Sequence, residues 1–357
     1  MFVSDKKTLT AGPTRPVRRE STSVVRSPAP SKPKQVSEGA AVLRRRDDTT
    51  PDPAPRELDA LTDFLVGKID GLMTMATAEN DVQLLKMLRG LVIEKDLDLP
   101  RFPAVGEELL RLESDSPQGG RRIAQLVAQD MDITGRVMQL ASSALYGRPV
   151  RSLEHAVARL GVEMVRQVAV GVSIQGVVYR VPGFEQETTE ARERAFRTGM
   201  AASRLATKQR RGTEAGEAFL AGLFHEVGLP LLYRLLSRLR SRTRGGRPTG
   251  LLISRVLRDL AGPLGLYYLT ERCLPEGVLE AVRYNSCPHR SEDGNWLAWT
   301  LWSLRVVDDA IDNDELEPLA DEWPDEAPEF EMVSSTVSGL RTAYTQRSRP
   351  AMSAAAG

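Results

Sequence analysis

The 357-residue sequence contains little cysteine, little histidine and few aromatic residues. Two cysteines cannot form a network of disulfides, and they exclude a metal or iron–sulfur centre held by several cysteines. Aromatic residues make up 5% of the chain and hydrophobic residues 41%, so the core must be built mainly from leucine, valine and alanine. Such a composition favours helices.

Long apolar runs and several well-known catalytic motifs are also absent. No run approaches the roughly 18 consecutive apolar residues of a membrane span, and no apolar segment follows the basic residues near the N-terminus. A Walker-type phosphate loop, paired-cysteine zinc spacing and a Gly-x-Ser-x-Gly elbow are not found. We therefore expect a cytoplasmic protein without a membrane segment and without a cofactor.

Charge is balanced overall, with 48 basic and 48 acidic residues, but it is distributed unevenly. Residues 1–46 carry eleven Lys or Arg and three Asp or Glu, and the segment is rich in Pro, Ser and Thr. This composition predicts a disordered basic arm over 1–55, serving as a solvated tether or as a contact for nucleic acid or an acidic partner. Residues 308–331 carry twelve acidic residues and no basic one. We expect 311–357 to form an acidic linker and a C-terminal tail, and pairing between arm and tail stays open.

Between these ends the apolar pattern is helical almost throughout. Leu58, Leu61, Leu65 and Ile69 recur at helical spacing, which predicts a helical lead-in segment over 56–96. The same periodicity continues over 97–310, without an alternating strand pattern of convincing length. The sequence therefore predicts an all-α protein.

His225 is the residue that most suggests chemistry. It follows an apolar helical face made by Leu220, Leu223 and Phe224, and the nearby Gly222 allows close helix packing. The adjacent pair His225–Glu226 could bind a metal if other helices supplied further ligands. The alternative is a buried histidine hydrogen-bonded to its neighbours, and the residues alone favour this alternative because there are only three histidines.

Five segments in order resemble the motifs of HDOD proteins, bacterial signalling relatives of the metal-dependent HD phosphohydrolases. These segments are Leu99–Val105, Gln129–Asp132, Leu140–Gly147, Ala156–Gly161 and Ala218–Gly228. The resemblance covers about 97–310. It implies an HDOD-like domain of two packed helical lobes, over about 97–180 and 187–310.

The departures from the family pattern decide the expected function. The position of the first metal-binding histidine corresponds to Thr198, the His-Asp pair becomes His225–Glu226, and a later histidine position holds Asn285. The late aspartate corresponds to Asp308 or Asp309. The resemblance thus leaves His225, Glu226 and Asp309 as weak metal candidates. Because a hydrolytic metal needs several ligands and an open water position, we expect a degenerate site that holds no metal.

Three functions follow from these observations. The first is a non-catalytic signalling or regulatory module that binds a protein partner of unknown identity through the degenerate pocket and the groove between the lobes. The second is a metal-dependent phosphohydrolase acting on a nucleotide. The third is a DNA-binding regulator that uses the basic arm or 121–147, which can be read as a helix-turn-helix. We favour the first, since Arg136 and Gln139 give 121–147 few groove-reading side chains and the family motif explains that segment better.

Overall fold

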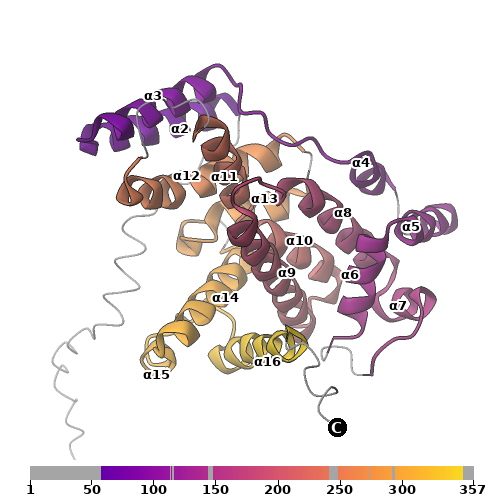
Figure 1. Cartoon of the computed structure of the whole chain (residues 1–357). Coiled ribbons are helices and arrows are strands. Elements are labelled where there is room, and N and C mark those ends of the chain that lie inside the picture. Colours follow the sequence, from indigo (N-terminus) through magenta and orange to yellow (C-terminus); the bar gives the residue numbers. More distant parts are fainter. Residues whose placement is uncertain are drawn as a thin grey trace, which may run out of the picture. The chain divides into compact units, whose positions relative to one another are not determined.

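The computed structural model describes residues 58–348, except 113, 115, 144–147, 241–247, 273, 292 and 293. All regular secondary structure in these residues is helical, as the sequence predicts (Figure 1). The basic arm expected over 1–55 lies outside the described residues.

The helices follow one another closely along the chain. The first half contains α2 (Leu58–Met75), α3 (Glu79–Ile93), α4 (Ala104–Arg111), α5 (Pro117–Gln129), α6 (Met131–Ala141), α7 (Leu153–Leu160) and α8 (Val162–Val178). The second half contains α9 (Glu185–Lys208), α10 (Ala215–Phe224), α11 (Gly228–Arg240), α12 (Gly250–Thr270), α13 (Glu276–Tyr284), α14 (Trp296–Asn313), α15 (Leu316–Ala320) and α16 (Phe330–Ser348). Two 3₁₀ turns, η1 (Gly212–Glu214) and η2 (Pro288–Arg290), precede α10 and α14.

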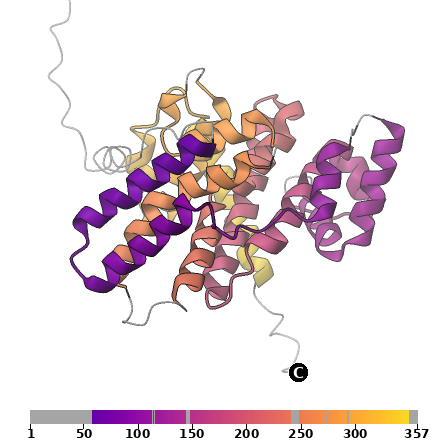
Figure 2. The ribbon, with the colours of Figure 1, turned by 90° about the horizontal axis from the view of Figure 1, so that it is seen from above.

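Helices α2 and α3 form an antiparallel hairpin that packs against α12 (Figure 2). The buried side chains of α2 recur at helical spacing and meet a leucine-rich face of α3. The carboxylate of Asp81, itself 5% exposed, joins the hairpin to α12. It accepts hydrogen bonds from the backbone N–H and the hydroxyl of Thr249, both at 2.7 Å. Thr249 in turn caps α12, because its hydroxyl accepts a hydrogen bond from Leu252 N.

This cap leads to a prediction about the hairpin. Replacing Asp81 by alanine leaves the N–H and hydroxyl of Thr249 without their acceptor, and we expect the free energy of unfolding to fall by about 1–3 kcal/mol. Asp63→Ala, at an exposed position of α2, serves as the control and should change it by less than about 0.5 kcal/mol. Urea unfolding of both variants measures the difference; equal effects would show that the Asp81 contact does not hold the hairpin.

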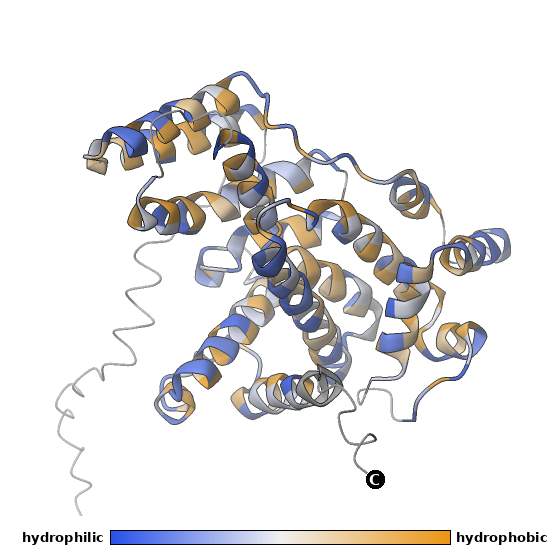
Figure 3. Ribbon diagram, viewed as in Figure 1, coloured by the Kyte–Doolittle hydropathy of each residue, from blue (hydrophilic) through white to orange (hydrophobic). Residues whose placement is uncertain are grey.

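Two groups of helices follow the hairpin, each packed on its own central helix. Helices α4 to α7 pack on α8, and α10 packs on α9, α13 and α14. The two groups are joined by contact between α8 and α10. α8 is apolar on almost every side, as its colouring in Figure 3 shows, and eleven of its seventeen residues are buried. The apolar stretch Val165–Val178 is therefore a buried helix.

Small residues let α9 and α10 approach closely, as the sequence predicts for Gly222. A Cβ atom on Gly222 would lie 2.7 Å from the backbone nitrogen of Gly199 in α9. Among the described residues one stretch, Ala215–Arg240, is long and apolar enough for a membrane span, but 78% of its apolar window is buried inside the protein. Residues 225–227 divide it into α10 and α11.

Two expectations about the second half need correction. The apolar pattern and Pro263 predict two helices over 250–261 and 263–273, yet α12 runs through Pro263 without a break. Its flanking residues Leu260 and Leu264 are both buried, and their packing holds the helix together despite the missing N–H. Residues 311–357 were expected to be a linker and tail, but they include the end of α14 and all of α15 and α16. In the part of α16 whose side chains are described, residues 330–342, the buried positions recur at helical spacing, the pattern of a helix that packs one face on the protein.

Candidate functional site

The candidate site lies at the turn between α10 and α11, which carries His225 and Glu226. α10 ends at Phe224, and α11 begins at Gly228 with Pro230 in its first turn, where a missing N–H is tolerated. The sequence pattern predicts instead that one helix continues from 214 to 228. The turn is fixed because Gly228 touches the backbone of α12: a Cβ on Gly228 would lie 1.7 Å from the carbonyl oxygen of Ala261.

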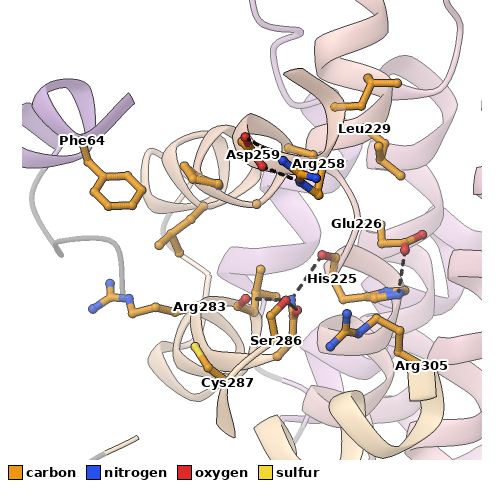
Figure 4. A pocket seen from close by; sticks show the side chains of 17 residues that line it. Phe64, His225, Glu226, Leu229, Arg258, Asp259, Arg283, Ser286, Cys287 and Arg305 are labelled. Atoms are coloured by element: carbon orange, nitrogen blue, oxygen red, sulfur yellow. Dashed lines mark hydrogen bonds and ion pairs between the residues drawn. The ribbon is translucent and has the colours of Figure 1, made fainter. Parts of the chain in front are cut away.

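The imidazole of His225 is almost completely enclosed, with 4% of its side chain exposed. Its Nδ1 donates a hydrogen bond to the carbonyl oxygen of Gly222 at 2.8 Å, and its Nε2 lies 3.9 Å from Glu226 Oε1 (Figure 4). Burial lowers the pKa of His225 below its ordinary value, and the partial compensation from Glu226 does not reverse this. The ring is therefore neutral at pH 7, with its proton on Nδ1.

Glu226 is held by an arginine from the neighbouring helix. Its Oε2 accepts a hydrogen bond from Arg194 Nε of α9 at 2.8 Å. Burial acts to raise the pKa of Glu226, but its electrostatic interaction with His225, the hydrogen bond and charge of Arg194, and the charge of Arg305 outweigh burial and lower the pKa below its ordinary value. The carboxylate is thus ionised at pH 7. Two guanidinium groups, from α9 and α14, act on this one carboxylate.

His225 and Glu226 line a cavity of about 320 Å³. Its apolar walls include Leu229, Leu257, Pro263, Leu266 and Val282, and its polar lining includes Arg258, Asp259, Arg283, Asn285, Ser286 and Arg305. Phe64 contributes from α2, so the lead-in hairpin forms part of the wall (Figure 4). Asn285 donates to the carbonyl oxygens of Val282 at 2.8 Å and of His225 at 3.4 Å, which ties α13 to the turn.

The structure brings together only some of the residues that the sequence predicts for one site. His225, Glu226 and Asn285 line the cavity. Thr198 and Asp308 line a separate small cleft between α9, α14 and α16. There Asp308 Oδ1 pairs with Arg341 Nε of α16 at 3.2 Å. Asp309 lines neither of these two cavities and is partly exposed.

These residues do not fit a catalytic metal ion. Within the described part of the chain, no group of three His, Cys, Asp or Glu side chains is placed to hold one. At the turn, the donors are His225 Nε2 and one oxygen of Glu226, because Arg194 binds the other oxygen. A hydrolytic zinc site uses three protein ligands and an open water position, so the donor set is incomplete.

Most of the lining residues are not predicted by the sequence, among them Arg305 and Phe64, and neither is Arg194, which binds Glu226. Arg194 precedes Thr198 by one helical turn, and the Thr198 hydroxyl donates to the Arg194 carbonyl oxygen at 3.1 Å. That spacing is a weak signal that the two share a helix face. Phe64 had no such signal, since its place in the wall depends on how the hairpin packs on α12.

The buried histidine leads to a prediction about pH. The folded state lowers the pKa of His225, so the unfolded chain binds its proton more readily. His225 thus contributes stability that is complete above its unfolded pKa of about 6.5 and is lost as the pH falls through that value toward the folded pKa. Urea unfolding at about pH 7.5 and about pH 5.5 should show a loss in wild type that shrinks in His225→Gln. The exposed His155 and His289 are present in both proteins, so an equal loss in both would contradict the burial effect.

Comparison with known proteins relates this arrangement to one family. The HDOD domain matches residues 99–288. No match was found among curated proteins.

Two solved structures with similar folds carry different names. A protein from Shewanella amazonensis SB2B, named a "putative metal-dependent phosphohydrolase", is 18% identical, with a TM-score of 0.55, covering 73% of this chain and 100% of that one. A protein from Marinobacter aquaeolei VT8, named a "putative signal transduction protein", is 19% identical, with a TM-score of 0.53, covering 85% of this chain and 69% of that one. At these identities the likeness concerns the fold.

Proposed function

Because the chain belongs to the HDOD family, we propose that it is a non-catalytic regulatory module that acts by binding a protein partner. The observation that carries this proposal is the ion pair between Arg194 and Glu226. The acidic member of the His–acid pair is bound by a guanidinium group.

Electrostatics opposes a metal ion at this place. Two unit charges 4 Å apart interact by about 4 kcal/mol at an effective dielectric constant near 20, and the repulsion doubles for a divalent cation. Arg194 contacts Glu226, and Arg305 lines the same cavity, so an ion bound by His225 and Glu226 would face two positive groups. Without a bound metal, the site lacks the Lewis acid that activates water in metal-dependent phosphoester hydrolysis.

The DNA-binding alternative receives little support from the helix that would enter the groove. Arg136 of α6 forms a bidentate pair with Glu193 of α9, with its closer contact at 2.6 Å, and it lies over the ring of Phe196 at 4.5 Å. The exposed positions of α6 are Met131, Asp132 and Gly135, which offer no basic group to a phosphate or base. The basic arm lies outside the described residues.

A phosphodiester assay tests the proposal against the hydrolase alternative. We expect full-length protein with added Mn²⁺ to hydrolyse bis(p-nitrophenyl) phosphate no faster than its His225→Ala variant. Metal-dependent turnover that disappears in His225→Ala would contradict the proposal. Capture of the same cellular protein by wild type and His225→Ala is the expected positive result.

A further inference from the structure

Helix α16 lies outside the HDOD match at 99–288 and packs across two helices that belong to the site region, α9 and α14. Over residues 330–342, where its side chains are described, the buried ones are Val333, Thr336, Val337 and Leu340, which are at most 6% exposed. They recur at i, i+3, i+4 and i+7, the pattern of a helix that buries one stripe. We call the surface beneath it the α9–α14 face, formed by Thr198, Ala201, Lys208, Leu304 and Asp308.

Polar contacts fix α16 on this face at two points. Lys208 Nζ donates to the hydroxyl of the buried Thr336 at 3.3 Å. Five residues after Thr336, Arg341 contacts the carboxylates of both Asp308 and Asp312 on α14. The face therefore presents acidic groups where the docked helix carries a cation, beside an apolar strip that accepts small aliphatic side chains.

Aromatic side chains fix the segment that precedes α16 against α14. Trp323 packs on Trp302 of α14 with ring centroids 5.5 Å apart and on Phe330 of α16 at 5.0 Å. The Trp323 indole also donates to the carbonyl oxygen of Pro328 at 2.7 Å. These contacts keep the segment leading into α16 on α14, so α16 remains tethered next to the face.

The fit of α16 on the face is incomplete. A space of about 20 Å³ remains between Val337 and Leu340 of α16 and the side chains of Thr198, Ala201 and Leu304. That is room for about one water molecule. Isolated helices of this length are only marginally stable in water, so α16 depends on its packing against α9 and α14. Segments with few buried contacts open most easily from the native state.

We propose that the α9–α14 face is a binding site for an amphipathic helix of a protein partner, and that α16 occupies this site until the partner displaces it. The inference rests on the proposed function, because it names the kind of partner that the module binds. The partner helix carries aliphatic residues at i, i+4 and i+7, a small residue at i+3 and a basic residue at i+8, the spacing that α16 shows from Val333 to Arg341. This is the helix-in-groove mode of recognition.

The face is connected to the candidate site through the same two helices. The hydroxyl of Thr198 on the face donates to the carbonyl of Arg194, whose side chain binds Glu226. On α14, Arg305 lines the cavity and Asp308, less than one turn later, belongs to the face. Replacement of α16 by a partner helix would thus take place next to Arg194 and Arg305, the two arginines that act on Glu226.

The test uses the full-length chain and a labelled peptide of residues 328–348. Val337→Asp places a carboxylate in the apolar stripe near Asp308 and should release α16. In wild type the tethered helix competes at an effective concentration on the order of mM, so we expect the variant to bind the peptide at least ~100-fold more tightly than wild type does. Amide exchange at 330–348 should rise in the variant while exchange in the α2–α3 hairpin stays unchanged.

Matched controls separate docking from general damage. Ser338→Asp adds the same charge on the exposed side of α16 and should behave as wild type. A peptide carrying Val337→Asp should not bind. If full-length Val337→Asp does not fold, Val337→Ala provides the same readouts with a smaller effect, because it removes two methyl groups and adds no charge.

Two results would overturn the proposal. A folded variant with α16 released that does not bind the peptide would show that the face does not accept a helix from solution. A dimer formed by exchange of α16 between copies, detected by light scattering, would assign the face to a second copy of this chain. Both results come from peptide binding and oligomeric state, and neither depends on a metal or on turnover. They can therefore contradict the docking proposal while the proposed non-catalytic function still stands.

Discussion

Replacing Gly228 by alanine should destabilise the fold more than any other conservative change near the site. The added Cβ would lie 1.7 Å from the carbonyl oxygen of Ala261 and 2.6 Å from its carbonyl carbon. Both atoms belong to the backbone of α12, so no side-chain rotation relieves the clash, and α11 and α12 must separate. Overpacking of cores usually costs about 1–3 kcal/mol. We expect a loss above that range because a helix must move.

Gly71→Ala is the matched control for this prediction. Gly71 lies inside α2, and its Cβ would meet nothing within 4 Å. Alanine is the better helix former by about 1 kcal/mol, so this variant should be slightly stabilised. Urea unfolding, followed by circular dichroism, measures both. A Gly228→Ala variant as stable as wild type would show that α11 and α12 do not meet at this point.

Replacing Arg194 by alanine should have the second largest effect, because it leaves Glu226 without its hydrogen-bonding partner. The Glu226 side chain is 24% exposed, so solvent compensates in part. We expect a loss of about 1–3 kcal/mol, the cost of an unsatisfied half-buried polar group. The pKa of Glu226 should rise in this variant, since Arg194 is one of the charges that lower it.

A double-mutant cycle isolates this interaction. Glu226→Gln removes the charge that Arg194 pairs with, so Arg194→Ala should cost much less in that background. Arg111→Ala is the control, because Arg111 is 79% exposed and pairs with Glu107 at 3.6 Å. Such surface pairs contribute about 0–1 kcal/mol. If the costs of Arg194→Ala were equal with and without the Glu226 charge, the ion pair would have no energetic role.

The sequence predicts the helical fold well because its apolar spacing is regular and its helix caps are local. Ser116, Asp130 and Ser152 each accept a hydrogen bond from the N–H three residues later, as N-cap residues do. The close approach at Gly222 is also confirmed, since only a backbone without a side chain fits against Gly199. The helix caps depend only on residues close in sequence, and the approach at Gly222 depends on a single backbone contact, so both can be predicted from the sequence.

The site was harder to predict because it depends on long-range partners. The motif places Thr198 and Asp308 together with His225. In the structure the side chain of Arg194 extends from α9 to the turn and binds Glu226. Asp308 pairs instead with Arg341 of α16. Basic residues are abundant in this sequence, and the only local signal is the weak one that places Arg194 one turn before Thr198. The sequence does not predict α16 because the acidic run before it indicates a solvated tail, and the buried stripe described over 330–342 contains three aliphatic residues and Thr336.

We propose that arginine, and not a metal ion, accompanies the His225–Glu226 pair. Elemental analysis of the purified, untagged full-length protein tests it most directly, with His225→Ala measured in parallel after incubation with Fe²⁺, Mn²⁺ or Zn²⁺ and dialysis. We predict that both proteins retain far less than one ion per chain, in equal amounts. Nearly stoichiometric metal in wild type that is lost in His225→Ala would contradict the claim.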